Sequence, residues 1–176
     1  MLMSLPLGSR FNVMSYSNHF QLMFEDERSV PNTDENISKA IQMAEKFDAM
    51  SHGTDILNPL MHIYKMGQPK DCFMTHIYIF TAGDVHNMPE ICNLVANQSN
   101  YNHKLHVFGL GEKANETLVK SSAIYGQGNF HMTLSGEDLA EKVINTIYWD
   151  KSDYTVLKSI RLFDKNDNMI QTNLSD

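Results

Sequence analysis

The residues that could carry chemistry gather around one segment, Met74–Asp84, which reads MTHIYIFTAGD. An apolar strand expected at His76–Thr81 runs directly into the small-residue turn Ala82-Gly83, and helix signals follow from Asn87 to Glu90. In doubly wound α/β proteins, ligands bind at the carboxyl ends of such strands. A metal site in this turn would require an acidic residue, but the sequence has Ala82. The segment therefore says more about the fold than about a reaction.

A second candidate site is the turn at Gly109–Ala114, GLGEKA, which matches the pattern GxGxxA between an expected strand and an expected helix. In dinucleotide-binding folds such a turn places pyrophosphate at the helix N-terminus. That fingerprint also needs an acidic residue at the end of the next strand, and Phe130–Thr133 has none. We interpret the turn as structural and keep a nucleotide-binding enzyme as the third hypothesis.

Metal-binding and nucleophilic motifs are also weak. His103 and His106 have a suggestive spacing, but on a strand that spacing directs the two side chains to opposite faces, and no Cys neighbours them. The sequence has no GxSxG motif that would mark a serine nucleophile. We therefore expect a protein that is not an enzyme.

Composition narrows the class of protein. The 176 residues are 42% hydrophobic, which suits one domain with a hydrophobic core and a short appendage. With 14 Lys and Arg against 21 Asp and Glu, the formal charge is −7 without any basic run, so a nucleic-acid partner is not expected.

Cys72 and Cys92 do not make a disulfide scaffold, and Cys92 is expected to be buried on a helix. No window approaches the roughly 20 apolar residues of a membrane span. We expect an intracellular, cytoplasmic protein, with a mitochondrial or cytoskeletal assembly left open.

Hydrophobic periodicity predicts strands that alternate with helices. From residue 56 to 147 this order implies a doubly wound, mostly parallel sheet with helices on both faces, an α/β fold. An antiparallel strand pair is expected before it, joined by Ser17–His19, and a β-hairpin after it, within residues 153–172. Strands are expected at 11–16, 20–24, 76–81, 104–108 and 130–133, and helices with inward faces at 37–47, 56–64, 91–95, 118–124 and 139–147. We place one domain at 1–149 and a hairpin extension at 150–176.

Together these segments resemble a von Willebrand factor type A (vWA) domain. The matching stretches are LPLGSRFNVMSYSNHFQLMF at 5–24, HGTDILNPL at 52–60, HIYIFTAGDV at 76–85 and LHVFGLGEKANETLVKSSAIYGQGNF at 105–130. The resemblance is strongest to the branch that follows a VIT domain, as in inter-alpha-trypsin-inhibitor heavy chains. It implies a mostly parallel sheet with, in many members, a divalent cation at the top, in the metal-ion-dependent adhesion site (MIDAS).

The resemblance implies MIDAS ligands from three places: a DxSxS motif after the first strand, a threonine in the second loop and an aspartate in a TDG-like turn. Thr54 stands at the threonine position and Ala82 at the aspartate position, while the DxSxS motif is missing. Asp84 lies two residues beyond the ligand position. Because hard cations need several oxygen ligands, we expect a degenerate MIDAS without a cofactor, with Thr54 and Asp84 as the remaining candidates for Mg²⁺.

The missing motif also implies a missing first strand, which lies in the middle of the sheet in this family. The sequence begins at the expected end of the first helix, so we expect an N-terminally truncated domain. Open apolar strand edges invite association. Three explanations stay open: the sequence is a fragment, a second polypeptide supplies the missing strand and helix by strand addition, or the strands at 11–16 and 76–81 pair directly.

We therefore predict a protein-interaction or scaffold subunit of a larger complex. The alternative is a divalent-cation-dependent ligand-binding domain that another chain completes. Further contacts are expected at the loops after residues 54, 84 and 111 and at the C-terminal hairpin. The predicted interaction residues lie on the two open strands: His76, Ile77, Tyr78, Ile79 and Phe80 on one, Phe11 and Val13 on the other.

Overall fold

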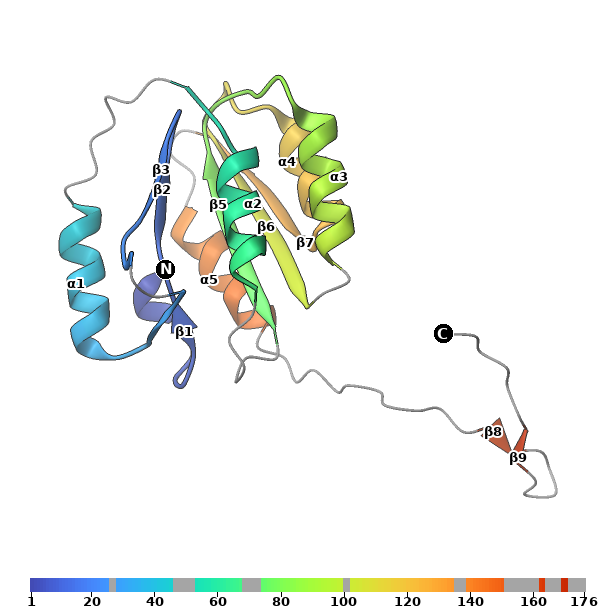
Figure 1. Ribbon diagram of the computed structural model, residues 1–176, viewed down its shortest axis with the longest axis horizontal. Helices are drawn as coiled ribbons and strands as arrows, with labels where there is room; N and C mark the ends of the chain where they lie inside the picture. The colour runs from blue at the N-terminus through green and yellow to red at the C-terminus, as the bar shows by residue number, and fades with distance from the viewer. Residues whose placement is uncertain are drawn as a thin grey trace.

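Figure 1 shows the computed structural model of the chain. It describes residues 1–25, 28–45, 53–67, 74–99, 102–134 and 139–150, together with the strands at 162–163 and 169–170. In chain order the elements are η1 (Leu2–Ser4), β1 (Arg10–Phe11), β2 (Met14–Tyr16), β3 (Phe20–Leu22), β4 (Val30–Pro31), α1 (Asp34–Ala44), α2 (Leu57–Met66), β5 (Thr75–Thr81), α3 (Met88–Ser99), β6 (His103–Leu110), α4 (Glu116–Tyr125), β7 (Gln127–Thr133), α5 (Leu139–Asp150), β8 (Leu162–Phe163) and β9 (Met169–Ile170).

The main sheet is parallel and has the order β5-β6-β7. Ile79 lies opposite Val107, and Val107 lies opposite Phe130. Such strands are covered on both faces, which is why β6 is almost continuously buried. The predicted parallel order is confirmed, and β6 and β7 are both longer than the apolar runs suggested.

Helices cover both faces of this sheet, as the predicted α/β fold requires. On one face α2, α3 and α4 enclose a core that includes Ile79, Leu105 and Val107. On the other face α5 contributes Val143 and Ile147, which pack against Phe108. The side chains at the centre of both layers are almost fully buried, since Phe108 is 0% exposed and Leu105 is 1% exposed.

The N-terminal region forms two small antiparallel pairs, β1 with β4 and β2 with β3. The predicted hairpin is confirmed, but the predicted strand at 11–16 is interrupted at Asn12. The Asn12 side chain takes over local backbone pairing, because its oxygen accepts from the backbone N–H groups of Val13 and Phe24 and its nitrogen donates to the Phe24 carbonyl. An amide side chain that competes for backbone partners in this way ends a strand.

Side chains cap the starts of α1 and α4 but not the start of α2. The Thr33 hydroxyl accepts from the Asn36 N–H at the start of α1. Three residues predicted to face inward are exposed instead: Ile124 (57%), Ile144 (44%) and Met43 (39%). Periodicity locates the apolar stripe of a helix but does not give its buried width. Cys92 is buried as expected.

Other predictions fall partly or wholly outside the described residues. These are the caps at Ser135 and Asp138, the inward position of Phe47 and the environment of Cys72. In the tail, β8 and β9 pair antiparallel, as predicted for a hairpin. The division into domains at residue 149 stays a prediction. Among the described helices, none is long and apolar enough to cross a membrane.

Candidate functional site

A cavity of about 640 Å³ lies between the N-terminal region and the main sheet. The hairpin β2-β3 and the sheet β5-β6-β7 are separate, so within the described strands β2 does not pair with β5. Direct pairing of these two strands, one of the three open explanations, is therefore wrong for the described residues. We call this cavity the β5 groove, because consecutive residues from Thr75 to Phe80 line it.

The β5 groove has walls on four sides. β5 forms one side, and Val13, Met14 and Tyr16 form the side opposite. Residues of α2, among them Leu60 and Ile63, cover one face, whereas Leu5 and Ile147 line the groove from the face on which α5 packs. The groove is thus a slot in the sheet layer with helical segments above and below.

All the predicted interaction residues line this one groove. His76, Ile77, Tyr78, Ile79 and Phe80 come from β5, and Phe11 and Val13 come from the N-terminal region. Ile77 and Ile79 are 7% and 8% exposed and also belong to the core under α2. The structure therefore brings these residues together, while their role in binding stays a prediction.

Tyr16 bridges the groove, a feature that sequence reasoning missed. Its hydroxyl donates to the backbone carbonyl of Phe80 at 2.7 Å and also contacts the side chain of Thr81. Burial raises the pKa of the Tyr16 hydroxyl above its ordinary value, and the Thr81 hydrogen bond offsets this in part. A tyrosine at the end of a short strand gives no sequence signal for a bridge to a residue 64 positions later.

A histidine pair lies beside the groove. The Nδ1 atom of His106 accepts the Asn129 backbone N–H at 3.1 Å, which leaves its Nε2 to carry the proton that faces Nδ1 of His76 at 3.2 Å. The rings of His76, Tyr78 and His106 stack, with Tyr78 and His106 at 4.8 Å between centroids. His103 instead meets Tyr64 of α2 edge-on, so His103 and His106 occupy opposite faces as predicted.

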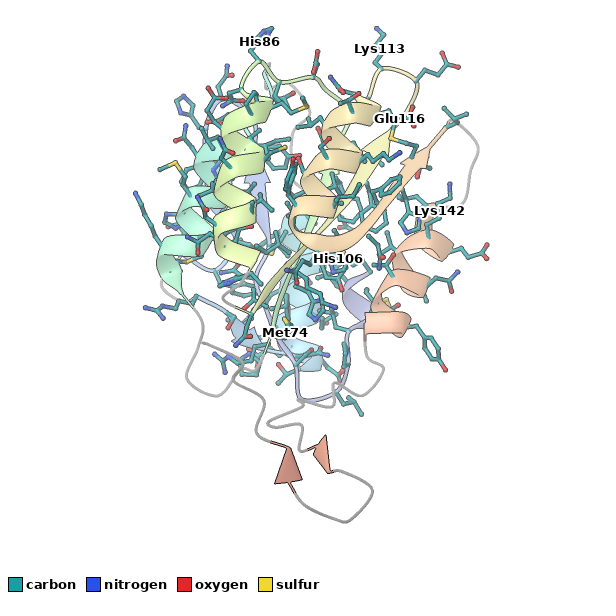
Figure 2. The ribbon with its side chains drawn as sticks, turned by 90° about the vertical axis from the view of Figure 1, so that its right-hand side faces the viewer. Met74, His86, His106, Lys113, Glu116 and Lys142 are labelled. Carbon is teal, nitrogen blue, oxygen red and sulfur yellow. The ribbon has the colours of Figure 1, made fainter. Side chains whose placement is uncertain are left out.

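The turn after β5, together with Thr54, is the region where the resemblance would place the MIDAS, which we expect to be degenerate. His86 and Lys113 lie at the opposite end of the molecule from Met74 in Figure 2. Thr54 packs against the turn after β5: a Cβ added to Gly83 would lie 2.2 Å from the Thr54 Oγ1 atom. Among the described residues, no group of three or more His, Cys, Asp or Glu side chains could hold a metal ion.

Comparisons with curated proteins point to one type of domain. No protein-family model matches the chain. Von Willebrand factor A domain-containing protein 5A of Rattus norvegicus is 28% identical over 151 residues, which are 84% of this chain and 17% of that protein. A von Willebrand factor A domain-containing protein of Dictyostelium discoideum is 26% identical over 82% of this chain and 15% of its own length. The chain thus spans about a sixth of the curated relatives that it matches.

Solved structures share the architecture. A conserved hypothetical protein, BatB of Bacteroides thetaiotaomicron, has a TM-score of 0.69 at 11% identity and covers 84% of this chain and 82% of its own. Proximal thread matrix protein 1 of the mussel byssus has a TM-score of 0.61 at 19% identity, over 80% of this chain and 36% of its own. This chain has a vWA-like fold.

In this vWA-like fold the two candidate cation ligands have other contacts. Asp84 is exposed, and its carboxylate accepts from the Val85 backbone N–H at 2.8 Å and from the Asn115 side-chain amide at 2.6 Å. These hydrogen bonds, that to Asn115 first, hold the pKa of Asp84 below its ordinary value. Asn115 in turn caps α4 by accepting the Leu118 N–H at 2.9 Å. Asp84 therefore links the turn after β5 to the start of α4.

Proposed function

We propose that this chain is a non-catalytic protein-interaction subunit of a larger complex, in which a partner polypeptide inserts an extended strand into the β5 groove. The observation that carries the proposal is the groove itself, a cavity of about 640 Å³ along the edge strand of the described main sheet. Strand addition to an exposed sheet edge is a recurring mode of peptide recognition, in which backbone hydrogen bonds give affinity and side-chain pockets give specificity.

The walls of the groove suit an apolar strand. An inserted strand would bury side chains on two faces, one set against Leu60 and Ile63 and the other against Leu5 and Ile147. Each large apolar side chain that leaves water contributes about 1.5–3 kcal/mol, so a few such side chains are enough to offset the cost of ordering a short segment.

The relatives support an interaction role without naming a partner. The curated homologues are named von Willebrand factor A domain-containing proteins. We extend the proposal to the VIT-associated branch of these domains and to an intracellular, cytoplasmic location, on the strength of the sequence alone. In this proposal the degenerate MIDAS takes no part in binding.

The test is the native mass of the particle that contains the chain, purified under mild conditions from its own cells. We expect a stoichiometric partner and a mass well above the 20.1 kDa of the chain. Phe80→Arg, which places a charge in the groove, is expected to release the partner. Phe130→Arg on the outer strand β7, where Phe130 is 38% exposed, is the matched control and keeps it. A monomer of this chain alone would overturn the proposal.

A second candidate is a divalent-cation-dependent domain that another chain completes. Two observations favour it: Thr54 packs against the Gly83 turn, and a structure of proximal thread matrix protein 1 with 19% identity is described with a zinc-occupied MIDAS motif. Mg²⁺ at millimolar concentration separates the two candidates. We expect no change in the melting temperature of the purified complex, whereas a rise that Thr54→Ala abolishes would favour the second candidate.

A further inference from the structure

A smaller cavity, with a volume of about 390 Å³, lies between the hairpin β2-β3 and the helix α2. We call it the hairpin pocket. Two separate parts of the chain supply its described lining: Asn18, His19 and Phe20 at the hairpin, and Asp55, Asn58, Met61, His62 and Lys65 at α2. None of these described residues lines the β5 groove, so the two cavities are separate.

Contacts between the hairpin and the start of α2 hold the two sides of the hairpin pocket in place. The Asp55 backbone N–H donates to the Ser17 carbonyl at 2.9 Å, which ties the chain just before α2 to the turn of the hairpin. Gly53 lies against the Asn18 side chain, because a Cβ added to this glycine would collide with the Asn18 Oδ1 atom. The tertiary fold therefore forms the pocket, and a single surface loop does not.

The side chains that α2 contributes to the hairpin pocket share one face of the helix. They are three or four residues apart, which is the spacing of neighbours on a helix surface: Asn58, Met61, His62 and Lys65. Leu60 and Ile63 belong to the other face and line the β5 groove. The Phe20 ring meets the His62 ring with 5.0 Å between centroids, so an aromatic group of the hairpin packs beside His62.

Basic side chains dominate the charge that the hairpin pocket offers to a ligand. The carboxylate of Asp55 is engaged by Asn58, whose backbone N–H donates to Oδ1 at 3.2 Å and whose side-chain amide donates to Oδ2 at 2.6 Å. The other titratable groups in the described lining are His19 from the hairpin turn and His62 and Lys65 from α2. Lysine and protonated histidine have hydrogen-bond donors and no acceptor. This arrangement favours an anionic ligand.

We propose that the hairpin pocket binds a small organic anion, with the oxyanion head held by His62 and Lys65 and the apolar body against Phe20 and Met61. A volume of about 390 Å³ lies in the range of small-molecule pockets, roughly 300–1,000 Å³. Because an anion favours the charged form of a neighbouring histidine, binding is coupled to proton uptake by His19 and His62. The proposal concerns other residues than the partner strand and does not depend on it.

The experiment titrates the full chain with benzenesulfonate, whose charge is the same at pH 6 and pH 8, and with the neutral analogue benzenesulfonamide. Backbone NMR resonances report where each compound binds. We expect saturating shifts at Asn58, His62 and Lys65 with benzenesulfonate. Binding is expected to be about three- to tenfold tighter at pH 6 than at pH 8, since imidazole takes up a proton in this range. The neutral analogue is expected to bind at least about threefold more weakly at pH 6.

Two pairs of variants test the residues. Lys65→Gln is expected to weaken the binding of benzenesulfonate about three- to tenfold. Lys39→Gln makes the same change on α1, which Figure 1 shows on the other side of the hairpin, and is expected to leave the affinity intact. His62→Gln is expected to reduce the dependence of binding on pH, whereas His86→Gln, in the loop after β5, is expected to keep it.

Four outcomes would overturn the proposal. Two are equal affinity for the anion and its neutral analogue, and equal affinity for the anion at pH 6 and pH 8. The third is an equal effect of Lys65→Gln and Lys39→Gln on binding. The fourth is a set of shifts confined to residues of the β5 groove. None of these outcomes bears on the partner strand, which the native-mass test decides.

Discussion

At the scale of single residues, Tyr16 holds the two halves of the described core together across the groove. Its hydroxyl bond to the Phe80 carbonyl joins β2 to β5, which share no ladder of backbone hydrogen bonds. We predict that Tyr16→Phe lowers the free energy of unfolding by about 1 kcal/mol, the usual net worth of such a bond. Urea denaturation measures it, and a variant as stable as the parent would show that the bridge contributes nothing.

Burial of two tyrosines predicts sensitivity to alkali. Burial raises the pKa of both Tyr16 and Tyr64, so the folded state keeps the protonated form that the unfolded chain loses near pH 10. The contribution of these two tyrosines to the free energy of unfolding is therefore fully present below about pH 10, and it declines as the pH rises further. Tyr64→Phe is expected to flatten the decline between pH 9 and about 11.5, measured by urea denaturation at each pH. If the stability of Tyr64→Phe fell with pH as steeply as that of the parent, Tyr64 would not be a cause of the alkaline sensitivity.

The contact between Thr54 and Gly83 predicts a compensating pair. A methyl group on Gly83 would meet the Thr54 Oγ1 atom at 2.2 Å, so Gly83→Ala is expected to cost about 1–3 kcal/mol. Adding Thr54→Ala removes the obstacle, and a double-mutant cycle should return a favourable coupling of at least about 0.5 kcal/mol. Gly128→Ala is the contrast, because its methyl group would meet the Leu105 carbonyl oxygen at 2.1 Å, and no side-chain change relieves that. Additive effects at Gly83 and Thr54 would contradict the contact.

At the scale of elements, the start of α4 is tied to the turn after β5 through Asn115. Asn115→Ala removes the cap on Leu118, and we expect a loss of about 1 kcal/mol, similar to that for the Thr33→Ala cap of α1. The same change removes the leading cause of the lowered pKa of Asp84. NMR of the Asp84 carboxyl resonance measures this pKa. We expect the titration midpoint of Asp84 to move to higher pH in Asn115→Ala and to stay where it is in Thr33→Ala. An unmoved titration of Asp84 in Asn115→Ala would contradict the link.

Strands and helices with strong periodicity could be predicted from the sequence, and those set by side-chain hydrogen bonds could not. β5, α3 and β6 follow from apolar runs and turn residues that act locally. The interruption of the strand after Phe11 depends on hydrogen bonds between the Asn12 side chain and Phe24, twelve residues later. The local sequence pattern does not encode such a contact. The exposure of Ile124 depends on the width of the interface that α4 makes.

At the scale of the whole molecule, one wall of the groove could be predicted and the others could not. The open edge of β5 is an expectation that the resemblance to vWA domains implies. Leu2, Leu5 and Ile147 come from the two ends of the domain, and only the packed structure brings them to the same slot.

Site-specific photo-crosslinking shows whether a partner strand occupies the β5 groove. A benzophenone amino acid replaces Phe80 in the groove or, as the control, Tyr125 on α4, which is 52% exposed. We expect an adduct from Phe80 alone, mapped by mass spectrometry to one extended apolar segment of a different polypeptide. Equal adducts from both positions, or an adduct from Phe80 to another part of the same polypeptide, would contradict it.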